Sequence, residues 1–254
     1  MKHFIRIFII LLLSYPVLTV QSQVNVKNSS ISIPMIFGSA AFHIPGGDMA
    51  DRFGASYAAG AGYMYKTKSN WILGVDFQYI FGTDIKIKDE LFSHLETSSD
   101  FIIDGNGVPA DVSVLERGHF TAVKFGKLFP VMGPNPNSGL IVTVGGGYIR
   151  HKLYISNIDN TAPQIKDDYR RGYDRLTAGF GATQFIGYVH LSNKRTVNFF
   201  AGIEFIETWT KSLRDYDFDL MKKDTKSRFD FLGGIKIGWI LPLYGRTPQE
   251  YYYY

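Results

Sequence analysis

The sequence predicts an all-β fold, an antiparallel up-and-down barrel of eight strands whose apolar face points outward. Three observations predict this fold: large apolar residues alternate with small or polar ones, eight segments carry that alternation, and the connections between them alternate between short and long. Alternation with a period of two indicates strands, because successive side chains of a strand leave opposite faces of the backbone.

The alternation is clearest in residues 71–82, 53–66 and 195–210. In residues 227–243, rings and branched side chains occupy one face, while glycines and Lys236 occupy the other. A soluble sandwich would carry Thr, Ser, Lys and Glu on its second face, rather than so many glycines. We therefore expect the apolar face to contact lipid and the other face to line a narrow lumen that side chains fill.

Eight segments are long enough to cross a bilayer as tilted strands, which takes about nine to eleven residues each. Pro34 in the first segment predicts a bulge or a strand end, because proline cannot donate to a ladder. A change of apolar parity near Gln184 predicts a bulge in the sixth. The predicted strands are 30–43, 53–66, 71–82, 118–131, 139–153, 174–190, 195–210 and 227–243.

The connections give independent support, because short turns alternate with longer polar loops. Outer-membrane barrels show this asymmetry, with tight turns on the periplasmic side, longer loops outside and both termini in the periplasm. We therefore expect a transmembrane barrel with short periplasmic turns and long extracellular loops. The short connections are 67–70, 132–139 and 192–195, and the long ones are 44–52, 83–117, 154–173 and 211–226.

Residues 1–22 are interpreted as a secretory signal peptide, because Lys2 and Arg6 accompany an apolar run that ends near the small residue Ser22. The alternative is a membrane anchor. We expect residues 23–244 to form the barrel in the bacterial outer membrane and residues 245–254 to form a periplasmic tail. The absence of cysteine excludes disulfides, thiolate metal sites and cysteine nucleophiles from this sequence. A net charge of +4, to which Lys2 and Arg6 contribute, favours no nucleic-acid partner.

Aromatic residues gather at both ends of the predicted strands, as expected where rings lie at headgroup depth. Trp71 and Trp239 fall at the short-turn ends, whereas Trp209, Phe53 and Phe229 fall at the long-loop ends. The predicted girdle comprises Trp71, Trp209, Trp239, Tyr63, Tyr65 and Phe81.

Through segments such as WILGVDFQYIFG and FDFLGGIKIGWI, the chain resembles the small eight-stranded outer-membrane β-barrel families. These include the transmembrane domain of OmpA and OmpX, and such barrels are common in Bacteroidota. The resemblance covers essentially the whole mature chain, and it is one of pattern and architecture. It implies a fold and a location rather than an activity. The chain departs from the usual aromatic last residue of the final strand, since GRTPQEYYYY follows Tyr244.

Four charged residues fall on the predicted lumen side near mid-strand. Lys236 neighbours Glu204 on the adjacent strand, and Asp76 likewise neighbours Lys124. We expect a satisfied internal network, because an unpaired buried charge costs several kcal/mol. The functional alternative is a gated ion or proton path.

Some small barrels of this membrane modify lipid A or cleave peptides with a histidine and a Ser or Asp near the outer rim. His43, His119 and His151 fall toward the long-loop ends, but no spacing joins any of them to a Ser or Asp as a dyad. We therefore expect no enzyme and no cofactor, with a lipid A-modifying enzyme as the alternative and a narrow pore as a third reading.

Asp215, Asp217 and Asp219 alternate in a way that superficially resembles a calcium loop. Such a loop requires glycine and glutamate where this chain has Leu220 and Lys226, so we expect no metal site. A strand extending above the membrane, with Tyr216 and Phe218 on its other face, would explain the alternation.

Loop 83–117 has eight acidic and three basic residues and contains the apolar runs LFSHL and FIID, which need cover. We expect it either to fold over the barrel mouth or to bind a protein, since long loops tend to be functional. The tail ends in four tyrosines, and aromatic residues are enriched at interfaces; the alternative is an unstructured end. We predict a structural or accessory subunit of an outer-membrane complex, contacting lipids and outer-membrane or periplasmic proteins. The tail candidates are Tyr251, Tyr252, Tyr253 and Tyr254.

Overall fold

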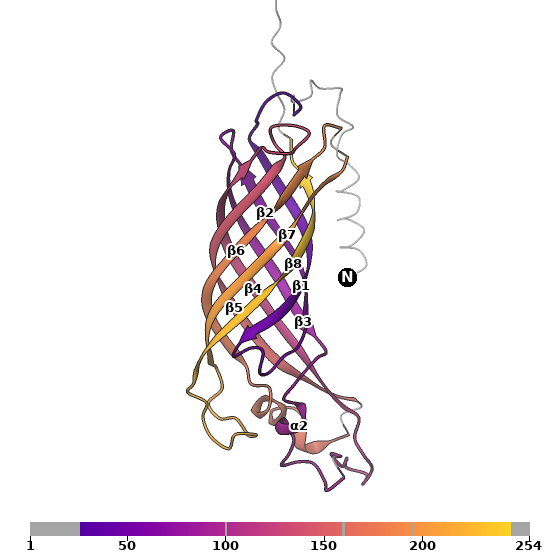
Figure 1. Cartoon of the computed structure of the whole chain (residues 1–254). Helices are drawn as coiled ribbons and strands as arrows, with labels where there is room; N and C mark the ends of the chain where they lie inside the picture. Colours follow the sequence, from indigo (N-terminus) through magenta and orange to yellow (C-terminus); the bar gives the residue numbers. More distant parts are fainter. Residues whose placement is uncertain (1–25, 100, 159–160, 195, 245–254) are drawn as a thin grey trace, which may run out of the picture. The chain divides into compact units, whose positions relative to one another are not determined.

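The computed structural model describes residues 26–99, 101–158, 161–194 and 196–244. Residues 26–243 form one compact unit, a closed barrel in which every strand pairs antiparallel with its neighbours in sequence and β8 closes onto β1 (Figure 1). The predicted fold class is confirmed. The strands are β1 (Ile33–Gly47), β2 (Ser56–Lys66), β3 (Trp71–Gly82), β4 (Val112–Phe129), β5 (Gly139–Asn157), β6 (Thr177–Leu191), β7 (Asn198–Ser212) and β8 (Ser227–Pro242).

All eight predicted strands are present, with shifted ends. β4 begins at Val112, which pairs with Asn157, so β4 and β5 form a long hairpin and the predicted loop 83–117 shortens to 83–111. β2 begins at Ser56, and the predicted outward position of Phe53 is wrong. Phe53 is 2% exposed, because the connection between β1 and β2 turns it into the hydrophobic core.

The alternation of short and long connections is less strict than predicted. The connection 130–138 is one residue longer than 48–55, although it lies at the short-turn end. The other connections follow the prediction: 67–70 and 192–197 are short, and 83–111, 158–176 and 213–226 are long.

The two predicted irregularities have different outcomes. Pro34 is the second residue of β1, so it occupies a strand end as expected. The predicted bulge near Gln184 is wrong, because β6 pairs with β5 and β7 in unbroken register. Phe185 and Val189 share the lumen face with Thr183, and the change of apolar parity reflects an apolar layer inside the barrel.

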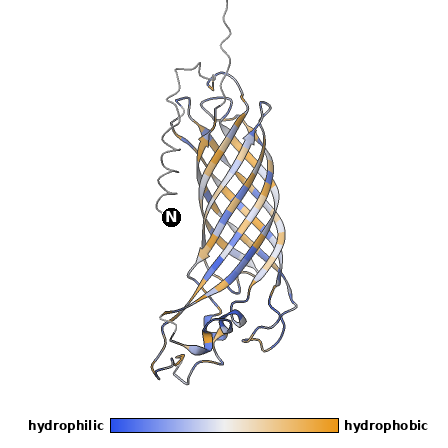
Figure 2. Ribbon diagram, turned by 180° about the vertical axis from the view of Figure 1, so that it is seen from behind, coloured by the Kyte–Doolittle hydropathy of each residue, from blue (hydrophilic) through white to orange (hydrophobic). Residues whose placement is uncertain are grey.

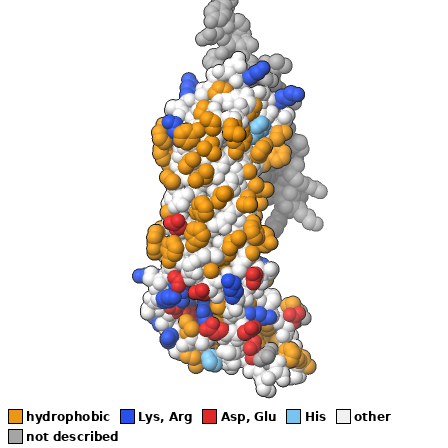
Figure 3. All heavy atoms as spheres, in the orientation of Figure 1, with side chains coloured by type: hydrophobic (Ala, Val, Ile, Leu, Met, Phe, Trp, Pro, Cys, Tyr) orange, Lys and Arg blue, Asp and Glu red, His pale blue; other side chains and the backbone are white. Residues whose placement is uncertain are grey.

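The outer face of the barrel is apolar. In β3, Trp71, Leu73 and Val75 begin an alternation of exposed and buried residues that continues to the strand end. The hydropathy colouring shows these alternating stripes along the strands (Figure 2). On the face shown in Figure 3, apolar side chains cover the strands, while charged side chains gather at the end that carries the long loops.

Within the described ranges, no helix has the length and apolar character needed to cross a membrane.

One hydrophobic cluster runs from the lumen into the long loops. Phe120 and Ile80 belong to it inside the barrel, and Leu91, Phe92 and Ile165 belong to it in the loops. Loop 83–111, which contains α2 (Lys88–Leu91), thus packs against loop 158–176, which contains η2 (Pro163–Ile165) and η3 (Tyr169–Gly172). Leu91, Phe92 and Ile102 of the two apolar runs are buried here, while Phe101 stays exposed. The long loops form a folded cap on this end of the barrel (Figure 1).

Candidate functional site

The structure brings the four predicted lumen charges together at mid-barrel. We call Asp76 of β3, Lys124 of β4, Glu204 of β7 and Lys236 of β8 the central lumen network. The Nζ of Lys124 lies 2.5 Å from Asp76 Oδ2 and 2.7 Å from Glu204 Oε1. The Nζ of Lys236 lies 3.1 Å from Glu204 Oε1 and also bonds Asp76 Oδ2. Each lysine therefore contacts both carboxylates, and the two positive charges balance the two negative ones.

The central lumen network is buried and extends to two further side chains. Gln78 donates from Nε2 to Glu204 Oε2 over 2.8 Å. His43 Nε2 lies 3.6 Å from the same oxygen. Asp76, Glu204 and Lys236 are at most 2% exposed. Such a network stabilises the lumen only while every member is present, because removing one leaves an uncompensated charge.

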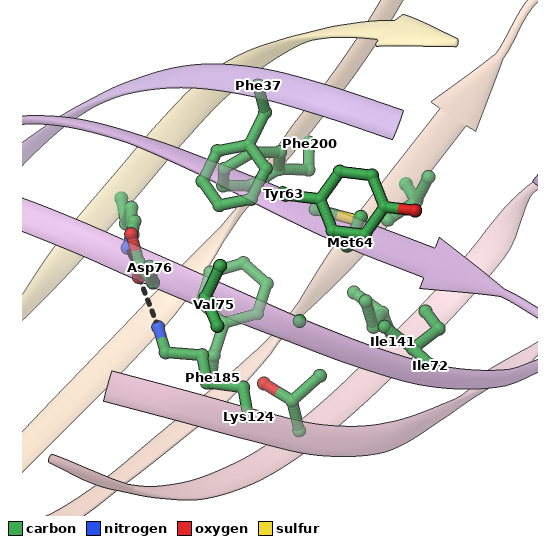
Figure 4. Close-up of a pocket in the computed structure, with 14 residues that line it drawn as sticks. Phe37, Tyr63, Met64, Ile72, Val75, Asp76, Lys124, Ile141, Phe185 and Phe200 are labelled. Atoms are coloured by element: carbon green, nitrogen blue, oxygen red, sulfur yellow. Dashed lines mark hydrogen bonds and ion pairs between the residues drawn. The ribbon is translucent and has the colours of Figure 1, made fainter. Parts of the chain in front are cut away.

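A layer of aromatic rings fills the lumen next to the network. The ring of Phe200 meets Phe37 edge-on at 5.4 Å and Phe185 edge-on at 5.7 Å. These rings, together with Asp76 and Lys124, line a cavity of about 50 Å³ (Figure 4). Apolar constrictions resist wetting, so a ring layer of this kind opposes hydration of the lumen at this level.

A second buried network lies at the long-loop end and was not predicted. We call Arg52, His151, Thr177, Thr210 and Asp230 the outer lumen network. Asp230 is its centre: it accepts from Arg52 Nη2 over 2.6 Å and from Thr210 Oγ1 over 2.5 Å, and its Oδ2 lies 3.1 Å from His151 Nε2. Burial lowers the pKa of Arg52, and the charge of Asp230 opposes that shift.

Asp230, His151 and Thr210 occupy the inward positions of the alternation in their strands. This alternation is the sequence signal that could have identified most of the outer lumen network. Arg52 carries no such signal. It comes from connection 48–55, so only the folded chain shows that it reaches Asp230.

The three candidate histidines do not form a common site. His43 and His151 lie inside the lumen, at 0% and 1% exposure, rather than on the rim. His119 points outward from β4, with its ring 6.4 Å from that of Phe77. The sequence spacing indicated no dyad, and it therefore did not predict the contact between His151 and Asp230.

The ring of His151 contacts both Thr177 and Asp230. Thr177 Oγ1 lies 3.1 Å from Nε2, the atom that contacts Asp230, and 3.4 Å from Nδ1. A hydroxyl–imidazole–carboxylate relay uses one ring nitrogen for each partner. The shorter contacts here place both partners on the same nitrogen, and all three side chains are buried.

The predicted girdle residues all point outward at the two ends of the barrel. Tyr63, Tyr65, Trp71 and Trp239 lie toward the short turns, whereas Phe81 and Trp209 lie toward the long loops. The Trp71 ring stacks on Phe125 at 4.9 Å, and Lys127 Nζ lies 5.0 Å from its centroid. Phe125, Phe42 and Phe180 are further exposed rings on the outer wall.

Loop 213–226 does not continue as the predicted strand. Asp217 forms a single bridge with Lys222, and Phe218 packs on Tyr173 with 5.5 Å between ring centroids. Asp217 is 1% exposed, and neither of its carboxylate oxygens has a hydrogen-bond partner among the described residues. Burial and the charges of Asp219 and Asp224 raise the pKa of Asp217 to about 6.

The part of the chain that the structure describes contains no group of three or more His, Cys, Asp or Glu residues arranged to hold a metal ion. Asp219 is instead paired with Arg175, and Asp224 with Arg228. The predicted signal peptide, residues 1–22, and the tail candidates lie outside the described residues. Those candidates are Tyr251, Tyr252, Tyr253 and Tyr254.

No family model matches the chain, and no curated protein matches it. Among solved structures, Neisserial surface protein A aligns at 9% identity over 82% of this chain and 96% of its own, with a TM-score of 0.40. Ail, the attachment invasion locus protein of Yersinia pestis, aligns at 9% identity over 84% and 99%, with a TM-score of 0.37. The N-terminal β-barrel domain of Pseudomonas aeruginosa OprF aligns at 12% identity over 81% and 97%, with a TM-score of 0.34. Likenesses this distant carry no functional argument, and the fold assignment rests on the strand pairing itself.

Proposed function

We propose that the chain is a non-enzymatic integral barrel of the bacterial outer membrane, with a lumen closed by side chains and a folded loop cap that contacts partner proteins. One observation carries the membrane assignment: a closed barrel has large apolar side chains exposed around its outer wall and charges inside. Trp239 is 67% exposed, Val123 is 58% exposed and Leu73 is 57% exposed, on three different strands. A soluble monomer rarely exposes a contiguous apolar surface of this extent.

The closed lumen argues for a structural rather than a conducting role. The charges of the central lumen network are paired with one another and the ring layer is apolar, so an ion would lose its hydration without gaining an uncompensated charge as a partner. At the long-loop end, Arg52 binds Asp230 within the outer lumen network, and the ring of Phe53 packs against His151 with 5.6 Å between ring centroids. Eight strands leave an interior only wide enough for side chains.

The loop cap supports a subunit role. The apolar runs of loop 83–111 are mostly covered within the cap, but Phe101 and Val108 remain exposed, each at 52%. Exposed apolar residues on an otherwise folded loop are available to a partner protein, and the tail tyrosines are the second candidate contact. We place the accessory-subunit role on these two surfaces.

Membrane fractionation tests the location. The chain should remain with the outer membrane after salt and carbonate washes, and the folded barrel should migrate faster than the heated chain on a detergent gel. A processed chain that stays monomeric in buffer without detergent would overturn the proposal. In planar bilayers the purified barrel should show no steady conductance above a detergent blank, and reproducible unitary steps would refute the closed lumen.

Affinity purification in mild detergent tests the subunit role. The full chain, a chain lacking residues 245–254 and a Phe101→Ser/Val108→Ser variant would be compared, with Met132→Ser as a control at the other end of the barrel. Met132 is 95% exposed in connection 130–138. The full chain and the Met132→Ser control should both retain a partner protein. The truncated chain or the Phe101→Ser/Val108→Ser variant should lose it. Identical recovery from all four chains would contradict the proposed contacts.

A further inference from the structure

A ladder of basic side chains, three of them Arg or Lys, runs along the outward face of β4 and β5 at the long-loop end. We call Arg117, His119, Arg150 and Lys152 the basic ladder. The register places Arg117 directly opposite Lys152 and His119 directly opposite Arg150. Like charges directly opposite each other on one face destabilise a sheet. Arg117 and Lys152 form such a pair, and Arg150 adds a third positive charge two residues away on the same face. This concentration of charge indicates that an anion compensates it when the protein is in its natural surroundings.

The acidic residues of the described chain compensate the ladder only in part. Lys152 Nζ lies 4.0 Å from Asp174, but Arg214 already binds that carboxylate through Nε and Nη2 over 2.8 and 2.5 Å. Arg117 donates to a backbone carbonyl over 2.7 Å and lies over the Tyr154 ring, 5.8 Å from its centroid. Neither Arg117 nor Arg150 has a carboxylate partner within the described ranges.

The ladder lines an open groove of about 670 Å³. Tyr79, Tyr154 and Arg214 also line it. The dimensions suit a sugar phosphate, and the lining combines cationic forks with flat rings. Guanidinium groups bind phosphate through two parallel hydrogen bonds, and this geometry makes arginine the preferred phosphate ligand.

The depth of the ladder on the barrel points to a lipid headgroup. Its residues pair with the outer aromatic level of β3, since Arg117 lies opposite Phe81 and His119 opposite Tyr79. Toward mid-barrel, the same faces of β4 and β5 carry the apolar residues Val123 and Val144. The cations therefore lie where acyl chains give way to headgroups.

The ladder covers only one side of the barrel. It continues across Ala178 of β6, which pairs with Arg150, to Lys211 of β7. At their long-loop ends β8, β1 and β2 instead present Phe229, Ile44 and Tyr57 outward. This confinement indicates a defined site rather than a general attraction to an anionic surface.

We infer that the groove over the basic ladder binds the phosphorylated headgroup of a glycolipid of the lipid A type in the leaflet at the long-loop end. Arg117 and Arg150 hold its phosphate groups, and Tyr79 and Tyr154 provide surfaces for its sugar rings. The inference rests on the proposed membrane location, because the groove meets headgroups only if the outer wall contacts a bilayer.

The experiment uses the purified barrel in nanodiscs of phosphatidylcholine that contain either diphosphoryl lipid A or its fully dephosphorylated form. Native mass spectrometry would count the glycolipids retained after release into detergent. The test variant is Arg117→Gln/Arg150→Gln. The matched control is Lys68→Gln/Lys127→Gln, which removes the same charge from exposed or outward positions at the short-turn end.

The wild-type chain and the control should retain diphosphoryl lipid A and not the dephosphorylated form. The test variant should retain diphosphoryl lipid A about tenfold more weakly for each guanidinium removed. A tenfold loss corresponds to about 1.4 kcal/mol, roughly the contribution of one charge-assisted hydrogen bond. Equal retention of both lipids, or equal loss in both variants, would overturn the site. Displacement of the lipid by inorganic pyrophosphate at equal concentration would overturn the lipid as occupant.

Gel mobility separates the two failures. A chain that never enters the nanodisc or shows no heat-dependent mobility shift contradicts the membrane proposal. A chain that inserts and folds but retains the two lipids equally contradicts the glycolipid site alone.

Discussion

Replacing Lys236 by methionine should destabilise the barrel by about 3–5 kcal/mol, the range measured when one member of a buried ion pair is removed. The substitution keeps the length of the side chain but leaves Asp76 and Glu204 with one lysine between them. Glu204→Gln should cost a similar amount, because it leaves Lys124 and Lys236 with one carboxylate. The measurement is urea unfolding of the barrel in lipid vesicles, followed by tryptophan fluorescence.

The double variant Lys236→Met/Glu204→Gln gives the sharper test. It leaves the neutral pair of Lys124 and Asp76, 2.5 Å apart, so its loss should fall short of the sum of the single losses by about 2–3 kcal/mol. Lys127→Met is the control, since this lysine points outward over Trp71 and its removal should cost about 1 kcal/mol or less. Losses that simply add in the double variant would refute the account of the network as mutually compensating charges.

Three further predictions concern the cap and the outer wall. Asp217 has a pKa of about 6 in the folded chain against an ordinary 3.8, so its proton binds the folded state more tightly and cap stability should fall as pH rises from about 4 to 6. Hydrogen exchange in residues 213–226 would show this trend and lose it in Asp217→Asn, whereas a trend that survives the substitution would assign it to another group. Phe92→Ala should destabilise the cap by about 3 kcal/mol, because Phe92 is 1% exposed. Limited proteolysis should then cut residues 83–111 faster than in the wild-type chain, while the barrel keeps its heat-dependent gel mobility. An unchanged rate of cutting would contradict the packing of Phe92 in the cap. Variants that retain a single tryptophan, at 71, 209 or 239, should all be quenched by lipids brominated near the headgroup, and an unquenched residue would not belong to the outer wall.

The alternation in the sequence predicts which strand residues face outward, but it does not predict how the side chains inside the lumen are arranged. Residues 71–82 were assigned correctly at every position, since lipid accepts only apolar side chains and polar residues must face inward. The lumen accepts both kinds of side chain, so Phe185 and Val189 were read as a change of parity. A barrel with an apolar layer inside gives no signal of that layer in a single strand.

The site contacts needed the closed ring. Neighbouring strands suggested two pairs, Asp76 with Lys124 and Glu204 with Lys236, but the bonds between those pairs cross the lumen. Arg52 was beyond prediction for a different reason, because it lies in a connection where no periodicity fixes the direction of a side chain. The direction of a connection residue such as Phe53 is set by its packing in the hydrophobic cluster, which is apparent only in the folded structure.

The distribution of the central lumen charges has a consequence for membrane insertion. The hairpin of β3 and β4 carries one carboxylate and one lysine in contact, and the hairpin of β7 and β8 carries another such couple. Each hairpin can thus carry its central charges into the bilayer as a neutral couple, before its counterpart arrives. The bonds from Lys124 to Glu204 and from Lys236 to Asp76 cross the lumen, so they form only when the two hairpins face each other. These bonds therefore stabilise the barrel only once it has closed.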